Sequence, residues 1–425
     1  MPAIIEVPTI VQQAVEQFGA VFANAPERRH FAEYLTGLLI AEKKNVSGIN
    51  AEFAETTDQS CLNRWITEVN WDAGALNRQR LAWLQHDPQT RYAPSGVIPI
   101  DNTLVDHAGK LIEDVGYFWD HAEQRHKIAH DYLIANYVCP SGKHYALEFR
   151  RFRKRADCEA EQARLAAQPG GVAATEAEQR LATFKSHTVL CGELIDWVVA
   201  QQIPGTFAFD SYFTNAPVCN HIAQHERAYV GDVKVNRKVW FRGVAMRADD
   251  MAAQIPPEAR KKVTLGDRTQ WYFTKKIWLP EYTHAVRVVI LWEHWNGKEP
   301  IKILLTNQTQ WAVTRVLCGY GHRWTGTETL HRDGKPHLGL GDCQLRSGEG
   351  QTRQCYLVLL VHRLRMAQLR QGRARAWATE TLTTIGEACR AVLRETLGKT
   401  ISWVIDRATL DGWQPNRIKA HLALI

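Results

Sequence analysis

The chain has 425 residues, of which 45% are hydrophobic and 23% charged, which is typical of a globular protein with enough apolar mass for two or three domains. The net charge of +7 is modest and does not by itself indicate a nucleic-acid partner. Nine cysteines without a CxxC pair argue against a disulfide scaffold or a zinc module and favour a reducing cytosol. No signal peptide is expected, and the longest apolar run, Cys355–Val361, is too short to cross a membrane.

The first 90 residues are predicted to form a small helical domain. Apolar residues recur there at helical spacing, in the order Phe31, Tyr34, Leu35, Leu38, Leu39 and then Leu62, Trp65, Ile66, Val69. Basic residues flank both stripes, so residues 1–90 are a candidate for binding DNA ends. The alternative is a packing domain with no role on DNA.

Strand patterns begin after a proline-containing linker at residues 86–95. Short apolar runs at 96–101 and 206–210 each end in an aspartate, and strands are also expected at 115–120, 131–138 and 144–152. Helices are expected at 156–167 and 175–202. This alternation of strands and helices predicts an α/β sheet, and residues 91–225 are interpreted as the first part of a catalytic core.

A β-rich block follows at residues 226–308. Its expected strands are 239–244, 271–279, 285–293 and 301–306, rich in Val, Ile, Trp and Tyr. We expect the block to be an insertion subdomain that leaves and re-enters the core at adjacent points. Helical character returns at Trp311. Residues 309–375 are interpreted as the second part of the core and 376–425 as a C-terminal helical region, with Cys355–Val361 open as a strand or a buried helix.

Basic side chains gather in three runs, and each run is a candidate for contacts with phosphate. The alternative for any one run is a solvated face. The runs are Arg150, Arg151, Arg153, Lys154 and Arg155; Arg260, Lys261 and Lys262; and Arg363, Arg365, Arg370, Arg373 and Arg375.

Asp101 and Asp210 are placed at the carboxyl ends of their strands, where open α/β sheets hold their sites. For either residue alone, a turn or cap role is the commoner interpretation. If the segment 328–335 is helical, Glu328, Arg332 and Lys335 share one face, which puts a carboxylate beside two cations. Three carboxylates are what phosphodiester cleavage needs to hold two metal ions about 3.5–4 Å apart.

Several blocks of this sequence are similar to those of one enzyme family. Tyr320, Arg323, Glu328 and Lys335 resemble the Tyr-x2-Arg-x3-Glu-x6-Lys signature of cut-and-paste insertion-sequence transposases of the DDE type, with four rather than three residues between Arg323 and Glu328. The resemblance covers roughly residues 28–365. Further matching blocks are Ile100-Asp101-Asn102-Thr103-Leu104, Phe209-Asp210-Ser211 and Asp342-Cys343-Gln344-Leu345-Arg346.

The resemblance implies a ribonuclease-H-like mixed α/β sheet with a β-rich insertion subdomain, an N-terminal helical domain and a C-terminal helical tail. It implies that Asp101, Asp210 and Glu328 are catalytic and hold Mg²⁺, with Mn²⁺ as a substitute. Tyr320 and Arg323, together with Arg332 and Lys335, would contact DNA. Four tryptophans of the insertion are candidates for base stacking, although a position in the core is the commoner interpretation of each: Trp271, Trp278, Trp292 and Trp295.

The resemblance also implies partners and a location. The expected partners are transposon ends and target DNA, bound by a homodimer or larger assembly in the bacterial cytoplasm at the nucleoid, with no membrane. Two alternatives stay open: a transposase-derived DNA-binding protein without cleavage activity, and a ribonuclease-H-like nuclease without strand transfer. In the expected fold Pro99 falls in a central strand, so a bulge is expected there.

Overall fold

The structure is a computed structural model that describes residues 4–121, 123–167, 176–369 and 381–422, with backbone alone at 176–177, 327–333 and 336. Its internal contacts divide the chain into two compact units. Unit 1 comprises Met1–His86, Leu104–His130 and His331–Ile425, and unit 2 comprises Asp87–Thr103 and Asp131–Leu330. Within the described ranges no helix is both long and apolar enough to span a membrane. All nine cysteines are free.

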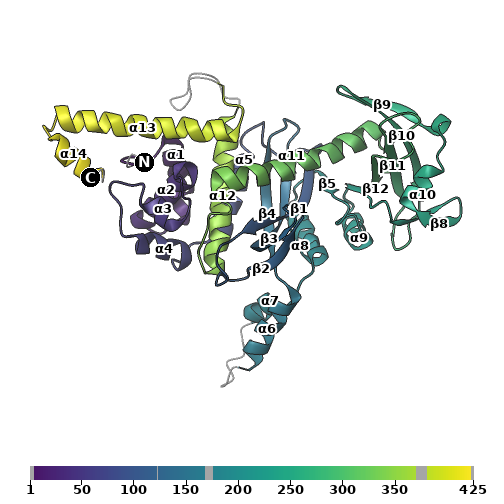
Figure 1. Cartoon of the computed structure of the whole chain (residues 1–425), viewed down its shortest axis with the longest axis horizontal. Coiled ribbons are helices and arrows are strands. Elements are labelled where there is room, and N and C mark those ends of the chain that lie inside the picture. Colours follow the sequence, from purple (N-terminus) through teal and green to yellow (C-terminus); the bar gives the residue numbers. More distant parts are fainter. Residues whose placement is uncertain (1–3, 122, 168–175, 370–380, 423–425) are drawn as a thin grey trace. The chain divides into compact units, whose positions relative to one another are not determined.

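Unit 1 is mainly helical (Figure 1). Its N-terminal helices are α1 (Thr9–Phe18), α2 (Ala25–Ile40), α3 (Val46–Asn50), α4 (Gln59–Thr67) and α5 (Ala73–Leu84), with a 3-10 turn η1 (Gly19–Val21). Its C-terminal helices are α12 (Gly348–Gln368), α13 (Ile385–Thr409) and α14 (Pro415–His421). The short strand β2 (Gly116–Asp120) pairs with the first residues of β3 (Arg125–Val138). The stripe expected in the first 90 residues, from Phe31 to Leu39, is buried.

Helix α12 is the centre of unit 1. It contacts α2, α4, α5 and α13, and the ambiguous run Cys355–Val361 is one of its buried segments. The sequence placed the N-terminal helices and the last third of the chain in separate segments, whereas here they pack into one unit. The physical reason is that the apolar surface of α12 is covered only when the N-terminal helices lie against it.

The third basic run does not form a phosphate-binding surface in its described part. Arg363 and Arg365 are buried in α12. The Arg363 guanidinium lies 3.9 Å from the ring centroid of Trp83. Arg365 donates to the carbonyls of Ala388 at 2.8 Å and Leu39 at 3.4 Å, and burial lowers its pKa to about 10. Arg365 therefore satisfies carbonyl groups of neighbouring helices, and Arg363 packs on an aromatic ring, while Arg370, Arg373 and Arg375 lie outside the described residues.

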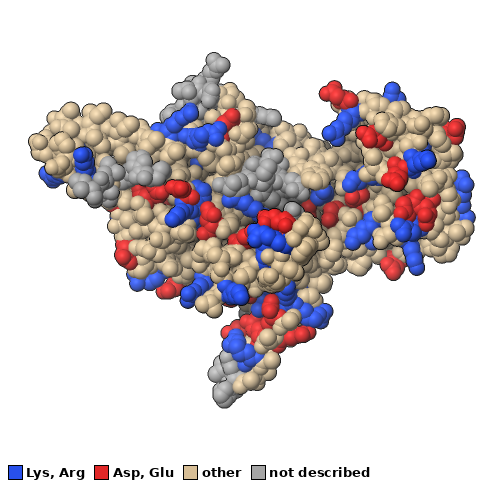
Figure 2. All heavy atoms as spheres, viewed as in Figure 1, with Lys and Arg blue, Asp and Glu red and all other residues tan. Residues whose placement is uncertain are grey.

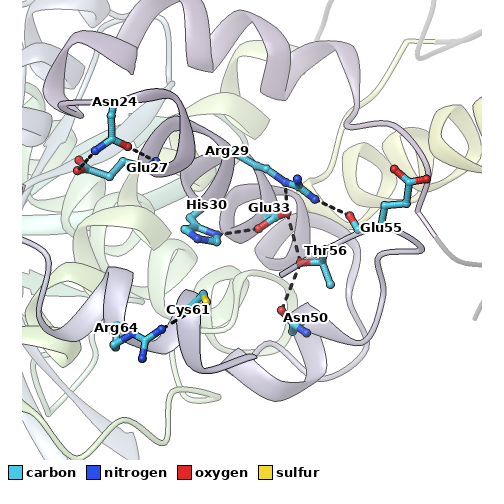
Figure 3. Close-up of polar contacts among 10 residues, drawn as sticks. All are labelled: Asn24, Glu27, Arg29, His30, Glu33, Asn50, Glu55, Thr56, Cys61 and Arg64. Carbon is cyan, nitrogen blue, oxygen red and sulfur yellow. Dashed lines mark hydrogen bonds and ion pairs between the residues drawn. The ribbon is translucent and has the colours of Figure 1, made fainter. Parts of the chain in front are cut away.

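A buried carboxylate links α2 to the chain that follows α3 (Figure 3). Glu33 is 3% exposed and accepts from Arg29 Nε at 2.9 Å and from Thr56 Oγ1 at 3.3 Å. His30 Nδ1 lies 2.9 Å from its other oxygen. Burial raises the pKa of Glu33, but the hydrogen bonds from His30 and Arg29 together outweigh it and leave the pKa lowered.

We expect Glu33→Gln to lower the free energy of unfolding by about 2 kcal/mol at pH 7, because charge-assisted hydrogen bonds to a buried group are lost. A lowered folded-state pKa stabilises the protein above the unfolded-state pKa, and this contribution is lost as pH falls. The deficit should therefore shrink below about pH 4. Urea unfolding at both pH values measures it. Glu16→Gln, at an exposed carboxylate of the neighbouring helix α1, is the control, and an equal deficit at both pH values would rule out the charge as the cause.

Unit 2 is built on a mixed sheet that includes β2 and the first part of β3 from unit 1. The described strands run in the order β2-β3-β1-β5-β6-β12-β11-β10-β9, with β4 (His144–Phe152) also paired to β3. The strands β1 (Val97–Asp106), β5 (Thr206–Phe209) and β6 (Tyr229–Asp232) are adjacent, and the β1–β5 and β5–β6 pairs are parallel. β3 and β4 are antiparallel. This arrangement is consistent with a ribonuclease-H-like fold.

One local expectation about β1 is wrong, and a second is not met where β1 pairs with β5. The strand does not end at Asp101 but continues to Asp106. Pro99 stays in regular register with Ala208 of β5, and no irregularity is found at that pair. The bulge in the described sheet lies instead between β3 and β4, at Ala135 and Asn136.

Helices of unit 2 connect and cover these strands. They are α6 (Arg155–Ala166), α7 (Glu176–Ala182), α8 (His187–Ala200), α9 (Ala216–Gln224), α10 (Ala248–Ala253) and the first part of α11 (Val313–Leu338), with a 3-10 turn η2 (Pro257–Ala259). The helix expected over 175–202 is two helices, because Ser186 caps the N-terminus of α8 through the amide of Val189.

The block expected to form a separate insertion is β-rich but joins the main sheet. Its strands are β7 (Lys238–Phe241), β8 (Val244–Arg247), β9 (Lys261–Leu265), β10 (Arg268–Ile277), β11 (Val286–Trp292) and β12 (Lys302–Thr306). β12 pairs with β6, and β11, β10 and β9 follow outward, while β7 and β8 form a separate hairpin. The block therefore extends the sheet instead of leaving it, because the edge of β6 offers backbone groups that need partners.

Candidate active site

Helix α11 lies across one face of the sheet (Figure 1). Its first turns pack through Val316 and Tyr320 into a core that includes Val230 of β6 and Leu304 of β12. Further along, Gly326 meets the sheet so closely that an added Cβ would stand 2.5 Å from Pro99 Cγ and 2.8 Å from Val138 Cγ2. The helix therefore crosses from β12 to β1 and β3 with its backbone almost against the sheet.

Asp101 and Asp210 stand side by side on this face. The β1–β5 register pairs Pro99 with Ala208, and each aspartate is two residues beyond its member of that pair. Side chains two apart on a strand share a face, and Pro99 faces α11 through Gly326. Adjacent strands are about 4.8 Å apart. Both carboxylates therefore point towards α11 from neighbouring strands.

A third carboxylate, Asp232, lies at the same level and was not predicted from the sequence. β5 and β6 pair Phe209 with Gly231, which sets Asp232 beside Asp210. Asp232 Oδ2 lies 2.9 Å from Lys302 Nζ of β12. The sequence contains a pattern that could have identified Asp232, because Tyr229–Asp232 is another short apolar strand that ends in an aspartate.

Arg323 and Tyr320 of α11 lie at these carboxylates. Arg323 is 6% exposed and its Nη1 donates to Asp101 Oδ2 at 2.7 Å. The Tyr320 ring has the Arg323 guanidinium 5.8 Å and Lys302 Nζ 5.5 Å from its centroid. Burial and then the Asp232 carboxylate raise the pKa of Tyr320, so its hydroxyl stays protonated. Two predicted DNA-contacting residues are thus brought to the aspartates.

The backbone holds Asp210 with one oxygen turned away from protein donors. Its Oδ1 accepts from the amides of Tyr212 at 2.9 Å and Phe213 at 3.1 Å, which closes the turn before α9. In the described part of the chain no hydrogen-bond donor or cation contacts Oδ2. A rigid carboxylate with a free oxygen is suited to binding a cation.

A second polar network borders the site and was also missed. Asn102, next to Asp101, donates from Nδ2 to Asp131 Oδ1 at 3.0 Å, and His187 Nε2 lies 2.8 Å from Asp131 Oδ2. Asp131 is 3% exposed, and the His187 ring stacks on Phe152. Two other histidines of this region are not part of the network, because His130 contacts His107 and His121 is exposed.

The remaining predicted residues are positioned only in part. Glu328 and Arg332 belong to α11, but their side chains lie outside those described. Glu328 is the fifth residue after Arg323 on α11, with four residues between them. Lys335 is an exposed residue of unit 1, whereas Asp101, Asp210 and Arg323 belong to unit 2. The structure thus brings together Asp101, Asp210, Tyr320 and Arg323.

The donor set suits a hard divalent cation. Asp210 Oδ2 and the oxygens of Asp101 are carboxylate ligands of the kind that Mg²⁺ prefers. Arg323 already holds Asp101 Oδ2, so a cation at Asp101 would have to share or displace that contact. Asp210 can therefore bind a cation as it stands, whereas Asp101 can do so only if Arg323 shares or releases its oxygen.

Comparison with known families decides the class of the protein. The sequence model of a family described as DDE superfamily endonuclease matches residues 17–284, more than half of the chain. The chain belongs to the DDE superfamily endonucleases. This membership implies a metal-dependent nuclease with DNA as substrate. The match to the endonuclease family includes Asp101 and Asp210, while α11 lies beyond its end. No curated protein matches the chain.

The surface of the endonuclease offers fewer free cations than its sequence suggested. Figure 2 shows Lys and Arg interspersed with Asp and Glu over the part that carries β9 and β10. Arg260 of the second run donates to the carbonyls of Trp295 and Gly297, whereas Lys261 and Lys262 are exposed. In the first run, Arg153 pairs with Glu161. These paired arginines reduce the charge available to a phosphate backbone.

The tryptophans of the β-rich block divide into two groups. Trp292 is fully buried beneath the Arg260 guanidinium, so it belongs to the core and its proposed stacking role is wrong. Trp271 is half-buried, whereas Trp278 is 62% and Trp295 47% exposed. Trp278 and Trp295 are therefore the two that can present a ring to a base.

We expect Arg323→Gln to raise the affinity of the DNA-free endonuclease for Mn²⁺ about tenfold, because a guanidinium no longer competes for Asp101. Electron paramagnetic resonance of free Mn²⁺ measures this binding. The same variant should hold DNA more weakly, with a shallower salt dependence. Arg315→Gln is the control, since Arg315 lies 3.8 Å from the ring centroid of Trp311. Unchanged Mn²⁺ affinity would show that Arg323 and the metal do not compete.

Proposed function

We propose that this endonuclease is an insertion-sequence transposase of the type with the Tyr-Arg-Glu-Lys signature. It would cut the ends of its own element and join them to target DNA. The observation that carries the proposal is the pair of level aspartates on the face crossed by α11, with Arg323 bound to Asp101. That contact brings the helix of the signature to the carboxylates, and Glu328 is five residues further along the same helix.

In this proposal Asp101, Asp210 and Glu328 hold Mg²⁺, or Mn²⁺ in its place. The bound ions would activate the attacking oxygen and stabilise the leaving oxygen of the phosphodiester. Asp210 contributes a fixed carboxylate because two backbone amides hold its other oxygen. The Asn102–Asp131–His187 network keeps β1 and β3 in place beside Asp101.

The side chains of α11 would position the phosphate. Arg323 has a planar guanidinium suited to a bidentate grip on phosphate oxygens, and leaving Asp101 for DNA would free that carboxylate at the same moment. Tyr320 can donate its hydroxyl proton, because its raised pKa keeps it neutral. Arg332 and Lys335 would extend the phosphate contacts along the helix.

The proposed reaction has two chemical steps. Water attacks phosphorus at the transposon end, the bond to the 3′ oxygen breaks, and a 3′-hydroxyl and a 5′-phosphate are left. The 3′-hydroxyl then attacks a second phosphodiester, on the opposite strand or in target DNA, and displaces its 3′ oxygen. Two ends must be brought together, so we propose a dimer or larger assembly on DNA, acting at the nucleoid of a bacterial cell.

One assay separates this function from its alternatives. The purified full chain is incubated with Mg²⁺ and a labelled duplex that carries the DNA flanking its gene, beside a scrambled duplex of equal length. A transposase yields nicks at one position and joined products. Nicks without joined products would indicate a nuclease without strand transfer. Specific binding without nicks would indicate a DNA-binding protein that no longer cuts.

A further inference from the structure

A cluster of metal-ligating side chains lies between α8 and α9, apart from the aspartates of the active site. Asp196 of α8 presents one oxygen to two imidazoles: its Oδ1 lies 2.7 Å from His221 Nε2 and 2.9 Å from His225 Nε2. His221 and His225 are four residues apart at the end of α9, so both rings project from one side of the helix. All three potential ligand atoms lie within 4.8 Å of one another.

The local sequence brings these groups together. Gly192, one turn before Asp196 on α8, lies next to His221, whose Cδ2 and Nε2 are 3.9 and 4.0 Å from the position of an added Cβ, an ordinary contact distance. The two rings meet edge to face, with centroids 4.9 Å apart, which directs both Nε2 atoms towards the carboxylate. Two histidines four apart on a helix is the spacing that zinc enzymes use.

The geometry is close to that of a tetrahedral site. Zinc binds imidazole nitrogen at about 2.0–2.1 Å and carboxylate oxygen at about 2.0–2.2 Å, so tetrahedral ligand atoms are roughly 3.3 Å apart. The two oxygen–nitrogen distances would therefore open by roughly half an ångström on binding. All three side chains are between 31% and 54% exposed, which permits that rotation and leaves room for water as a fourth ligand.

We propose that Asp196, His221 and His225 form a binding site for Zn²⁺ or a similar imidazole-preferring divalent metal. Neutral histidines can move their proton from Nε2 to Nδ1, which frees the Nε2 lone pairs, and no described group occupies either Nδ1. The site ties α8 to α9, the helix that follows Asp210. Its chemistry differs from that of the aspartates, because Mg²⁺ favours oxygen ligands and Zn²⁺ favours imidazole.

The site lies near the amino ends of β5 and β6, whereas Asp210 follows the carboxyl end of β5. β5 runs towards Asp210 and β6 runs parallel to it, so α9 has to return along the sheet before β6 begins. His221 and His225 are at the end of that return. A metal there would act on the stability of the α8–α9 pair, independently of the proposed transposition.

The test uses Co²⁺ as a spectroscopic probe and Zn²⁺ as a competitor on the full chain, in excess Mg²⁺. We expect wild type to bind one Co²⁺ with d–d absorption but no thiolate charge-transfer band, which excludes the nine free cysteines as ligands. Zn²⁺ should displace it with micromolar affinity. His221→Ala and His225→Ala should each weaken binding at least about a hundredfold, while His294→Ala, at an exposed histidine of the same unit, should leave it unchanged.

Asp196→Asn gives an independent check in case an alanine variant fails to fold. Its amide oxygen can still accept from both imidazoles, so the hydrogen bonds persist while the anionic ligand is lost, and Co²⁺ binding should weaken about tenfold. Binding that survives equally in all variants would overturn the proposal. Absence of binding by wild type at about a hundredfold excess of metal would overturn it too, and would leave the cluster as a hydrogen-bonded network only.

Discussion

Alanine at Asp101, Asp210 or Glu328 should reduce DNA cleavage by at least about a thousandfold while leaving DNA binding largely intact. Several kcal/mol of transition-state stabilisation depend on bound metal ions, and each carboxylate is expected to hold them. Affinity comes instead from Lys and Arg contacts to phosphate, which these substitutions leave in place. The measurement is a gel-shift titration beside a cleavage assay on one labelled duplex that carries the DNA flanking the gene.

The structure supplies a matched comparison for this series in Asp232→Ala. Asp232 stands level with Asp210 but pairs with Lys302, so its loss should affect cleavage far less than loss of Asp210. If Glu328→Ala cuts DNA near the wild-type rate and Asp232→Ala does not, the third carboxylate is Asp232. The assignment of Glu328 from the signature would then be wrong, but the assignment of Asp101 on β1 and Asp210 after β5 would be unaffected.

Gly326→Ala is expected to lower cleavage at least about a hundredfold and to reduce the free energy of unfolding by about 1–3 kcal/mol. An added methyl group would overlap Pro99 and Val138, so α11 must move away from the sheet. That shift would carry Arg323 away from Asp101 and Glu328 away from its expected position. Chemical unfolding and single-turnover cleavage measure the two effects.

Gly321→Ala is the matched control on the same helix. Nothing lies within 4 Å of a Cβ added at Gly321, and alanine favours helix over glycine by up to about 1 kcal/mol. The control should therefore be as stable as wild type or slightly more so, with normal cleavage. Equal loss of cleavage in both variants would mean that flexibility of α11, and not its close approach to the sheet, matters.

Short buried strands that end in aspartate were predictable, but the length of β1 was not. Val97–Ile100 is buried on both faces and reads as a continuous apolar run. From Asp101 onwards the strand alternates between buried and exposed residues, as a strand does when one face is free. The change of pattern was interpreted as the end of the strand, whereas it marks where the second face of the sheet becomes uncovered.

The end of α11 shows that glycine and proline do not always mark where a helix ends. Glycine and proline disfavour the interior of a helix, yet α11 contains Gly334 and Pro336 and continues to Leu338. It ends where Gly339 takes a φ of +75°, a left-handed conformation that favours glycine, and the Leu340 amide donates to the Gly334 carbonyl at 3.1 Å. Burial of Leu338 and Leu340 supports this end, and no single-residue propensity reports such tertiary contacts.

The positions of site residues on strands could be predicted from the sequence. The positions of those on α11 could be predicted only in part. Alternation along β1 and β5 is enough to align Asp101 with Asp210 once the strands are paired. Arg323 reached the site as the signature implied, but as a partner of Asp101. The extra residue before Glu328 changes the helical phase by about 100° relative to the three-residue spacing, which motif spacing alone cannot resolve.

The path of the chain through the two units bears on how the protein can form during synthesis. Unit 1 needs α12, whose Arg353 and Arg365 donate to the carbonyls of Ile66 and Leu39 near the ends of α4 and α2. Those arginines leave the ribosome more than 280 residues after the helices that they complete. The N-terminal helices must therefore wait with an uncovered apolar surface while the whole of unit 2 is made. An N-terminal fragment would keep that surface permanently, and it should bind chaperones or aggregate instead of acting as an independent DNA-binding module.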